Sequence, residues 1–319
     1  MLKKKIAFII GVTGQDGSYL SSFLIKKNYQ VFGFTRSKNK KNLVKLSRIQ
    51  VLKKIKLVKY NENDPITILK KIKKFNPSEI YYFSGQSSVS KSFEEPIETY
   101  SSNINLLFQI LNFCKNYSKS TSIYNSCSTD CFGDNKKIFC DEKTEFNPRS
   151  PYAQSKAFSF WLVKYYREQF NLKSCNGILS NHESPLRGDN FVLKKIINYA
   201  INSKEHKQKL FLGNTSIFRD WGWTPDYIEA IYKINNAKVK KDYVVGTGKI
   251  SSLEEIIKKI FKIFNIDMRL LVKNKKKFLR MDEIKKIGCR IDNIKNDLNW
   301  RPKISINQII QKLIKNELF

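Results

Sequence analysis

Short apolar runs alternate with longer stretches of helical periodicity through the first half of this 319-residue chain. The runs are typical of buried strands, and in the longer stretches apolar positions recur every three or four residues. The expected strands span residues 5–10, 30–35, 55–60, 80–83, 122–126 and 174–179, and the expected helices 18–27, 65–75, 100–117 and 151–170. Alternation at this spacing predicts an α/β fold with a parallel, doubly wound sheet.

Beyond Ser180 the alternation becomes less regular, and a lysine-rich stretch covers residues 273–277. No internal repeat or low-complexity linker marks the change. We expect a nucleotide-binding domain over residues 1–180. A smaller α/β C-terminal lobe over residues 181–319 is expected to bind substrate and to be partly interleaved with the first domain.

Composition narrows the class of protein. Apolar residues make up 41% of the chain, which excludes global disorder. No run comes near the roughly 18 uncharged apolar residues that span a bilayer, and the short apolar start lacks a signal-peptide cleavage site. Six cysteines without a CxxC pair, and only two histidines, indicate free thiols in a reducing cytoplasm and no metal site.

The net charge of +31 at pH 7 has two interpretations. Lysine supplies 49 of the 59 basic residues, alanine occurs only six times, and the lysines are scattered over the whole chain. This bias towards residues with A/T-rich codons favours solvated surface lysine, and attraction to a polyanionic ligand such as a nucleotide is the alternative. A nucleic-acid binder is disfavoured, because there is no basic stripe with interleaved aromatic residues.

Three glycines follow the first expected strand: Gly11, Gly14 and Gly17. Glycine at these places allows a tight turn, close approach of the backbone to a pyrophosphate and close packing of helix on strand. The helix N-terminus then offers N–H groups to phosphate. The order of strand, turn and helix therefore predicts a Rossmann-like dinucleotide site, with a plain βα turn as the alternative.

The residue that ends the second strand indicates which dinucleotide binds. An acid there would accept a hydrogen bond from the ribose 2′-hydroxyl of NAD, but this chain has Arg36. A cation suits a 2′-phosphate, so we expect NADP. The alternative is a surface arginine in a lysine-rich loop.

Tyr152 and Lys156 form a Tyr-x-x-x-Lys pair near the start of an expected helix. Residues at this spacing share a helix face. A nearby ammonium stabilises tyrosinate, so we expect the pKa of the Tyr152 phenol to be lowered towards the working range of a base. The pair also occurs by chance, and its position after a dinucleotide loop and several βα units favours the catalytic interpretation.

A hydroxyl and a carboxylate follow the strand before this helix. Ser128 lies near the carboxyl end of that strand, where it can form a hydrogen bond with a substrate oxygen. Asp130 faces the same side if the segment stays extended. The alternative is an ordinary turn, rich in residues that bond their own backbone.

Several segments together resemble the GDP-mannose 4,6-dehydratase family of extended short-chain dehydrogenases/reductases. They are Gly11-Val12-Thr13-Gly14-Gln15-Asp16-Gly17, Asn181-His182-Glu183-Ser184-Pro185-Leu186-Arg187-Gly188, Arg219-Asp220-Trp221-Gly222 and Leu298-Asn299-Trp300-Arg301-Pro302. The likeness spans nearly the whole chain. The Asn-His-Glu-Ser-Pro segment is far more specific than any glycine pattern.

The resemblance implies an internal redox cycle on a GDP-sugar. Tyr152 takes the proton of the C4 hydroxyl while hydride passes to NADP⁺. Asp130 then removes the C5 proton, water leaves from C6, and the hydride returns to C6. Ser128 matches the family's hydroxyl position. The product is a GDP-4-keto-6-deoxy sugar.

The resemblance also implies which residues bind the ligands. Those expected at the cofactor are Gly11, Thr13, Gly14, Gln15, Asp16, Gly17, Arg36, Glu62, Gln86, Ser87, Tyr152, Lys156, His182 and Arg187. Those expected at the GDP-sugar are Ser88, Asn181, Asn190, Lys194, Arg219 and Arg280. Family members are commonly oligomeric, so a homodimer or homotetramer is expected.

Two departures from the family pattern lie at the centre of the expected site. This chain has Ser128 where the family usually has threonine, and Asp130 where it has glutamate. The shorter carboxylate would fall about 1 Å short of the sugar, and displacement on this scale can cost roughly 100-fold in rate. A GDP-heptose dehydratase, or a GDP-keto-sugar reductase or epimerase, therefore stays open, and a non-catalytic nucleotide-sugar sensor is a more remote alternative.

Overall fold

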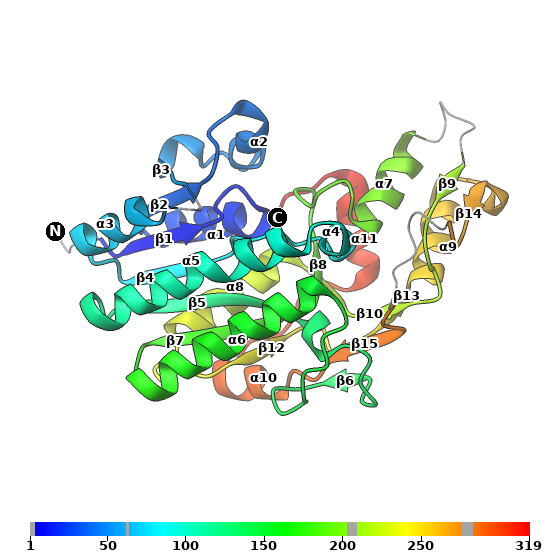
Figure 1. Ribbon diagram of the computed structural model, residues 1–319. Helices are drawn as coiled ribbons and strands as arrows, with labels where there is room; N and C mark the ends of the chain where they lie inside the picture. Colours follow the sequence, from blue (N-terminus) through cyan, green and yellow to red (C-terminus); the bar gives the residue numbers. More distant parts are fainter. Residues whose placement is uncertain (1–3, 62–63, 203–208, 276–282) are drawn as a thin grey trace.

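Strand β1 (Ile6–Ile10) lies inside a seven-stranded sheet, and the chain winds outward from it in both directions (Figure 1). The structure is a computed structural model that describes residues 4–61, 64–202, 209–275 and 283–319. The strand order is β12-β7-β5-β4-β1-β2-β3, and all neighbours are parallel. The other strands are β2 (Gln30–Thr35), β3 (Lys56–Lys59), β4 (Glu79–Tyr82), β5 (Ser122–Ser128), β7 (Ser174–Leu179) and β12 (Tyr243–Val245).

The predicted doubly wound fold is confirmed. Each expected strand is present with ends that agree to within two residues, and β12 adds an edge strand from beyond residue 180. The boundary at residue 180 stays a prediction. Within the first 180 residues, the periodicity did not predict α2 (Lys40–Arg48) or α4 (Val89–Glu94).

Helices cover both faces of the sheet, as the alternation of side chains along β1 requires. Phe8 and Ile10 belong to one core, and Ala7 and Ile9 to the other, because successive strand residues point to opposite faces. The first core packs against α3 (Ile66–Phe75), α5 (Pro96–Tyr117) and α6 (Pro151–Phe170). The second packs against α1 (Gln15–Lys26), α8 (Thr224–Asn236) and α10 (Asp292–Leu298).

A third hydrophobic core lies in the second half of the chain, where Trp221 and Trp223 pack among helices. These helices are α7 (Val192–Asn202), α9 (Leu253–Ile263) and α11 (Ile306–Lys315). The strands of this part are β6 (Phe139–Cys140), β8 (Asn181–Glu183), β9 (Leu210–Phe211), β10 (Phe218–Arg219), β11 (Trp221–Trp223), β13 (Ser251–Ser252), β14 (Leu271–Val272) and β15 (Lys286–Cys289). Strand β6 comes from the first half of the chain and pairs with β15.

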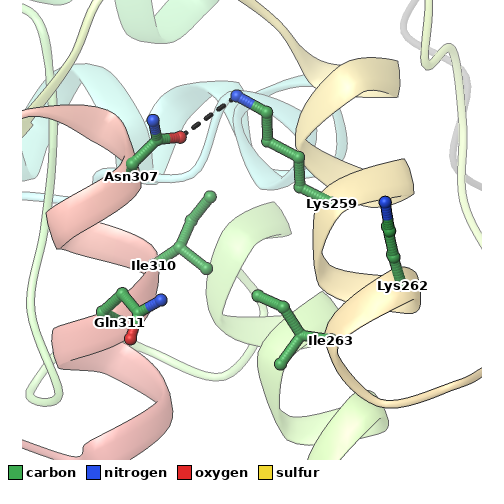
Figure 2. Close-up of a pocket in the computed structure, with 6 residues that line it drawn as sticks. All are labelled: Lys259, Lys262, Ile263, Asn307, Ile310 and Gln311. Carbon is green, nitrogen blue, oxygen red and sulfur yellow. Dashed lines mark hydrogen bonds between the residues drawn. The ribbon is translucent and has the colours of Figure 1, made fainter.

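A cavity of about 440 Å³ opens between α9 and α11 (Figure 2). Its lining residues are Lys259, Lys262, Ile263, Asn307, Ile310 and Gln311. It contains none of the residues that the sequence predicts for chemistry. The candidate site lies instead where the strands of the main sheet end.

The described part of the chain contains no helix with both the length and the apolar character to cross a bilayer. Within the same residues, no cluster of three or more histidine, cysteine, aspartate or glutamate side chains is suited to a metal ion. All six cysteines are buried free thiols.

Replacing Gly17 with alanine is expected to destabilise the fold. A Cβ at Gly17 would lie 2.5 Å from the carbonyl oxygen of Gly11 and 2.7 Å from Cα of Val12, and neither is a flexible side-chain atom. Overpacking of this kind costs about 1–3 kcal/mol in the free energy of unfolding. The matched control is Gly14→Ala, whose Cβ would meet its nearest neighbour at 3.3 Å. Urea denaturation that gives equal stability for the two variants would contradict this packing.

Candidate active site

The glycine turn after β1 forms a backbone cradle. Gly11 has φ +88°, and its N–H donates to the carbonyl oxygen of Phe34 at 3.1 Å. A Cβ at Gly11 would come within 3.0 Å of the Ser84 nitrogen, so the backbone after β4 approaches the turn closely. Helix α1 begins at Gln15, three residues earlier than expected, and no side chain caps it at Gly14. This helix start is therefore suited to hold a phosphate.

The segment after β5 turns back on itself. Residues Thr129–Phe132 form a short 3₁₀ helix, η2, so the segment does not stay extended and the alternative of a turn is the one observed. The turn forms because Ser128 Oγ accepts a hydrogen bond from the Asp130 N–H at 3.2 Å and caps the helix. The Asp130 carboxylate nevertheless returns towards the strand end, with Oδ2 3.4 Å from Ser128 Oγ.

Helix α6 carries Tyr152 in its first turn. Ser150 caps this helix by accepting a hydrogen bond from the Ala153 N–H at 3.1 Å, and Pro151 follows as the first helical residue. Proline is well tolerated there because that N–H has no partner within the helix. The helix is therefore fixed at the end that bears the phenol.

Three contacts attach α6 to β5 and to the η2 turn that follows it. Lys156 Nζ donates to the Ser126 carbonyl oxygen at 3.0 Å. The thiol of Cys127 lies 3.6 Å from the Lys156 carbonyl oxygen, and the thiol of Cys131 lies 3.5 Å from that of Ala153. The contacts hold Tyr152 and Lys156, both more than nine-tenths buried, beside the end of β5.

Burial dominates the electrostatics of this pair. It raises the pKa of Tyr152, the negative charge of Asp130 raises it further, and the Ser128 hydroxyl lowers it by a smaller amount. Burial also lowers the pKa of Lys156. The expectation of a lowered phenol pKa is thus wrong for the protein alone, because desolvation disfavours the tyrosinate and the ammonium of Lys156 is directed at Ser126.

The segment after β7 is hydrogen-bonded to the first turn of α1. His182 Nε2 lies 3.0 Å from Asp16 Oδ1, and Nδ1 donates to the Ser180 carbonyl oxygen at 2.8 Å. Gln15 Nε2 donates to the His182 carbonyl oxygen at 3.1 Å, and Ser184 Oγ donates to Gln15 Oε1 at 2.8 Å. The predicted cofactor residues Gln15, Asp16 and His182 are therefore in direct contact.

The pKa of the Asp16 carboxyl group is held low by its neighbours. Burial alone would raise the pKa of its carboxyl group, but His182 and Arg187 outweigh burial and hold the pKa below the ordinary value of 3.8. Arg187 lies over the Phe191 ring, 3.8 Å from its centroid, and its Nε is 3.8 Å from Glu183 Oε2. Arg187 Nε is buried, and the described residues supply no acceptor for its N–H. A buried donor without an acceptor is suited to bind an anionic ligand.

Arg36 lies beyond β2, with Nη1 3.8 Å from Oε1 of Glu98. Thr13 lies in the turn between β1 and α1. Gln86 packs onto α5, where its Nε2 donates to Thr99 Oγ1 at 3.2 Å, and the Ser88 side chain caps α4.

The remaining predicted residues lie further along the chain. Asn181 begins β8, and Lys194 lies in the first turn of α7. Arg219 is buried in the smaller sheet, where Nη2 lies 3.1 Å from Glu283 Oε1. Ser87 and Asn190 are exposed. Glu62 and Arg280 lie outside the described residues.

Three contacts were missed by reading the sequence alone. They involve the Ser126 carbonyl, the Ser184 hydroxyl and the Glu98 carboxylate. Ser184 belongs to the Asn-His-Glu-Ser-Pro segment, which was a signal for it. Ser126 acts through its backbone and Glu98 meets Arg36 only through the fold, so neither has a local signature.

Comparisons with known proteins give one family. A family model described as GDP-mannose 4,6 dehydratase matches residues 8–313. A GDP-mannose 4,6 dehydratase of Drosophila melanogaster is 32% identical, over 99% of this chain and 87% of the fly protein. GDP-mannose 4,6 dehydratase 1 of Arabidopsis thaliana is 33% identical, over 99% of this chain and 90% of the plant protein.

Solved structures with the same fold show lower sequence identity. A dTDP-glucose 4,6-dehydratase from Bacillus anthracis, in complex with NAD, superposes with a TM-score of 0.85 at 19% identity, over 98% of this chain and 96% of that one. A UDP-glucose 4-epimerase from Thermotoga maritima, with UDP-glucose, gives a TM-score of 0.86 at 19% identity, over 98% of both chains. At this identity the likeness establishes the fold.

The Asp16→Asn variant is expected to lose stability in a pH-dependent way. A carboxyl group whose pKa is lower in the folded chain stabilises the fold above its ordinary pKa, and this contribution is lost as the pH falls through the folded pKa. At pH 7 the variant should be about 1–3 kcal/mol less stable than the wild type. The difference should shrink below pH 3.8, the ordinary value.

The matched control for Asp16→Asn is Asp134→Asn, which alters an exposed carboxylate. Urea denaturation at pH 7 and pH 3.5 measures both variants. A stability difference for Asp16→Asn that is independent of pH would contradict the stabilising contacts of the Asp16 carboxylate with His182 and Arg187.

Proposed function

Because the chain belongs to the GDP-mannose 4,6-dehydratase family, we propose that it converts GDP-mannose to GDP-4-keto-6-deoxy-mannose and water. The observation that carries the proposal is the junction of β5 and α6. It brings Ser128, Asp130, Tyr152 and Lys156 to the carboxyl end of one central strand. Ligands of open parallel sheets bind outside such strand ends.

The proposed coenzyme is NADP. The Gly11 turn and the uncapped start of α1 fit a pyrophosphate, and Arg36 supplies a cation beyond β2 for a 2′-phosphate. Lys156 would hold the ribose next to the nicotinamide. When bound, the nicotinamide supplies the acceptor and later the donor of hydride for the sugar.

Tyr152 is the proposed proton acceptor for the sugar's C4 hydroxyl. Its buried phenol is protonated in the protein alone, since burial and the charge of Asp130 raise its pKa. The hydrogen bond of Ser128 favours the tyrosinate, and Lys156 adds a positive charge on the same helix face. Tyr152 therefore depends on both neighbours to act as a base.

Asp130 is the proposed base for the C5 proton. Its carboxylate follows the strand end that carries Ser128, on the side of Tyr152. A carbonyl at C4 makes the adjacent C–H acidic, which is the condition for a carboxylate to remove that proton.

The side chain of Asp130 is shorter than that of glutamate, which favours a second candidate function: a GDP-keto-sugar reductase or epimerase that uses Tyr152 alone. A GDP-heptose substrate is the alternative within the dehydratase class.

The proposed assembly is a homodimer or homotetramer. Phe158, Trp161 and Tyr165 are each about half exposed and recur at helical spacing on α6, and Phe108 and Ile97 are exposed on α5. Figure 1 shows α5 and α6 side by side on the outside of the sheet. Exposed apolar side chains on two neighbouring helices are suited to an interface, and the same helices of a second copy can cover them by two-fold symmetry.

Incubation with GDP-mannose and NADP⁺ is expected to yield a product lighter by one water, without net formation of NADPH. Asp130→Asn should lower the rate at least about 100-fold, because a positioned base contributes that much or more. Asp130→Glu is the matched control and should retain activity. Mass analysis of the product and absorbance of NADPH make the two measurements.

Two results would contradict this assignment. Stoichiometric consumption of NADPH in a parallel incubation with NADPH and a GDP-4-keto-sugar, with no loss of water from GDP-mannose, would indicate a reductase. Unchanged turnover in Asp130→Asn would exclude the carboxylate as the base. A parallel incubation with GDP-heptose decides between the two sugars.

The variant Trp161→Glu is expected to dissociate the assembly into monomers, because it places a charge in the proposed apolar interface. The control is Val239→Glu, which changes an exposed apolar residue outside α5 and α6. Sedimentation velocity measures the mass of each. A monomeric wild type, or equal assembly in both variants, would contradict an interface on α5 and α6.

A further inference from the structure

Two opposite charges meet where the adenosine ribose of the coenzyme is proposed to lie. Arg36 follows β2, and Glu98 lies in the first turn of α5, with 3.8 Å between Nη1 and Oε1. Glu98 also lines a small cavity of about 30 Å³, together with Tyr60 after β3 and Ser84 after β4. The Glu98 carboxylate therefore approaches the ends of β3 and β4 from helix α5. The acid expected in an NAD site would instead follow β2.

A second ion pair adjoins the first. Lys91 Nζ lies 2.8 Å from Glu95 Oε2. Its hydrogen bond and charge contact with Glu95 raise the pKa of Lys91, Glu98 contributes in the same direction, and Arg36 opposes it. Glu98 and Arg36 contribute least to this pKa, so each cation has its own carboxylate: Glu95 pairs with Lys91, and Glu98 pairs with Arg36.

The balance matters for the choice of coenzyme. A 2′-phosphate is anionic, and an arginine whose charge is shared with a carboxylate attracts it less strongly. The 2′-hydroxyl of NAD is neutral and can donate a hydrogen bond to a carboxylate. A glutamate at this place therefore disfavours NADP and favours NAD at the same time.

We propose that Glu98 is a specificity-determining residue that lowers this chain's preference for NADP over NAD. The inference rests on the proposed nicotinamide coenzyme site. Arg36 attracts the 2′-phosphate, and Glu98 opposes that attraction. The chain therefore accepts both coenzymes, with a preference for NADP that is smaller than Arg36 alone would produce.

The expected effect is modest, because both side chains are about half exposed to solvent. Exposed ion pairs are screened by water and salt. Removal of the Glu98 charge should raise the ratio of the NAD⁺ dissociation constant to the NADP⁺ dissociation constant about three- to tenfold.

The test is direct binding of NADP⁺ and NAD⁺ to the full chain by isothermal titration calorimetry, at one fixed ionic strength. Glu98→Gln is expected to raise the ratio, and Arg36→Gln to lower it. The matched control is Glu95→Gln, which removes the same charge from a neighbouring position but breaks the pair with Lys91. It should leave the ratio within about twofold of the wild type.

An unchanged ratio in Glu98→Gln, or an equal rise in Glu95→Gln, would overturn the inference and leave the proposed function standing. Wild-type protein that binds neither coenzyme would overturn the proposed function itself and the inference with it. Because binding is measured without turnover, a loss of catalysis cannot imitate either result.

Discussion

The docking of α6 against the end of β5 is the constraint on which the rest of the site depends. Lys156 reaches the backbone of Ser126, and the thiols of Cys127 and Cys131 contact carbonyls of the helix. A helix turns about 100° per residue, so a slip of one residue would rotate the phenol of Tyr152 away from the strand end. The placement of the acid–base group therefore follows from ordinary packing between strand and helix.

The site is electrostatically balanced before any ligand arrives. Burial favours the neutral forms of both Tyr152 and Lys156, since it raises the pKa of the first and lowers that of the second. Asp16 faces His182, and Arg36 faces Glu98. A coenzyme and a diphosphate would bring negative charge to a chain of net charge +31, so their binding would change this balance.

The sheet could be predicted because β1 and its neighbours are short apolar runs with glycine after the first. Other parts depend on contacts that no local pattern reveals. Helix α2 buries only Leu46, so its sequence carries a weak apolar stripe. The turn at Asp130 depends on one hydroxyl of Ser128 that could equally have pointed to solvent. The pairing of Arg36 with Glu98 exists only because the end of β2 and the start of α5 lie near each other in the fold.

We propose that a single sugar, held at the junction of β5 and α6, is oxidised at C4 and reduced at C6 without leaving the site. GDP-mannose deuterated at C4 tests it most directly, with the product examined by mass spectrometry and NMR. If hydride passes from C4 to the coenzyme and back to C6, the deuterium is retained and found at C6. Deuterium that is lost to free coenzyme, or that stays at C4, would contradict it.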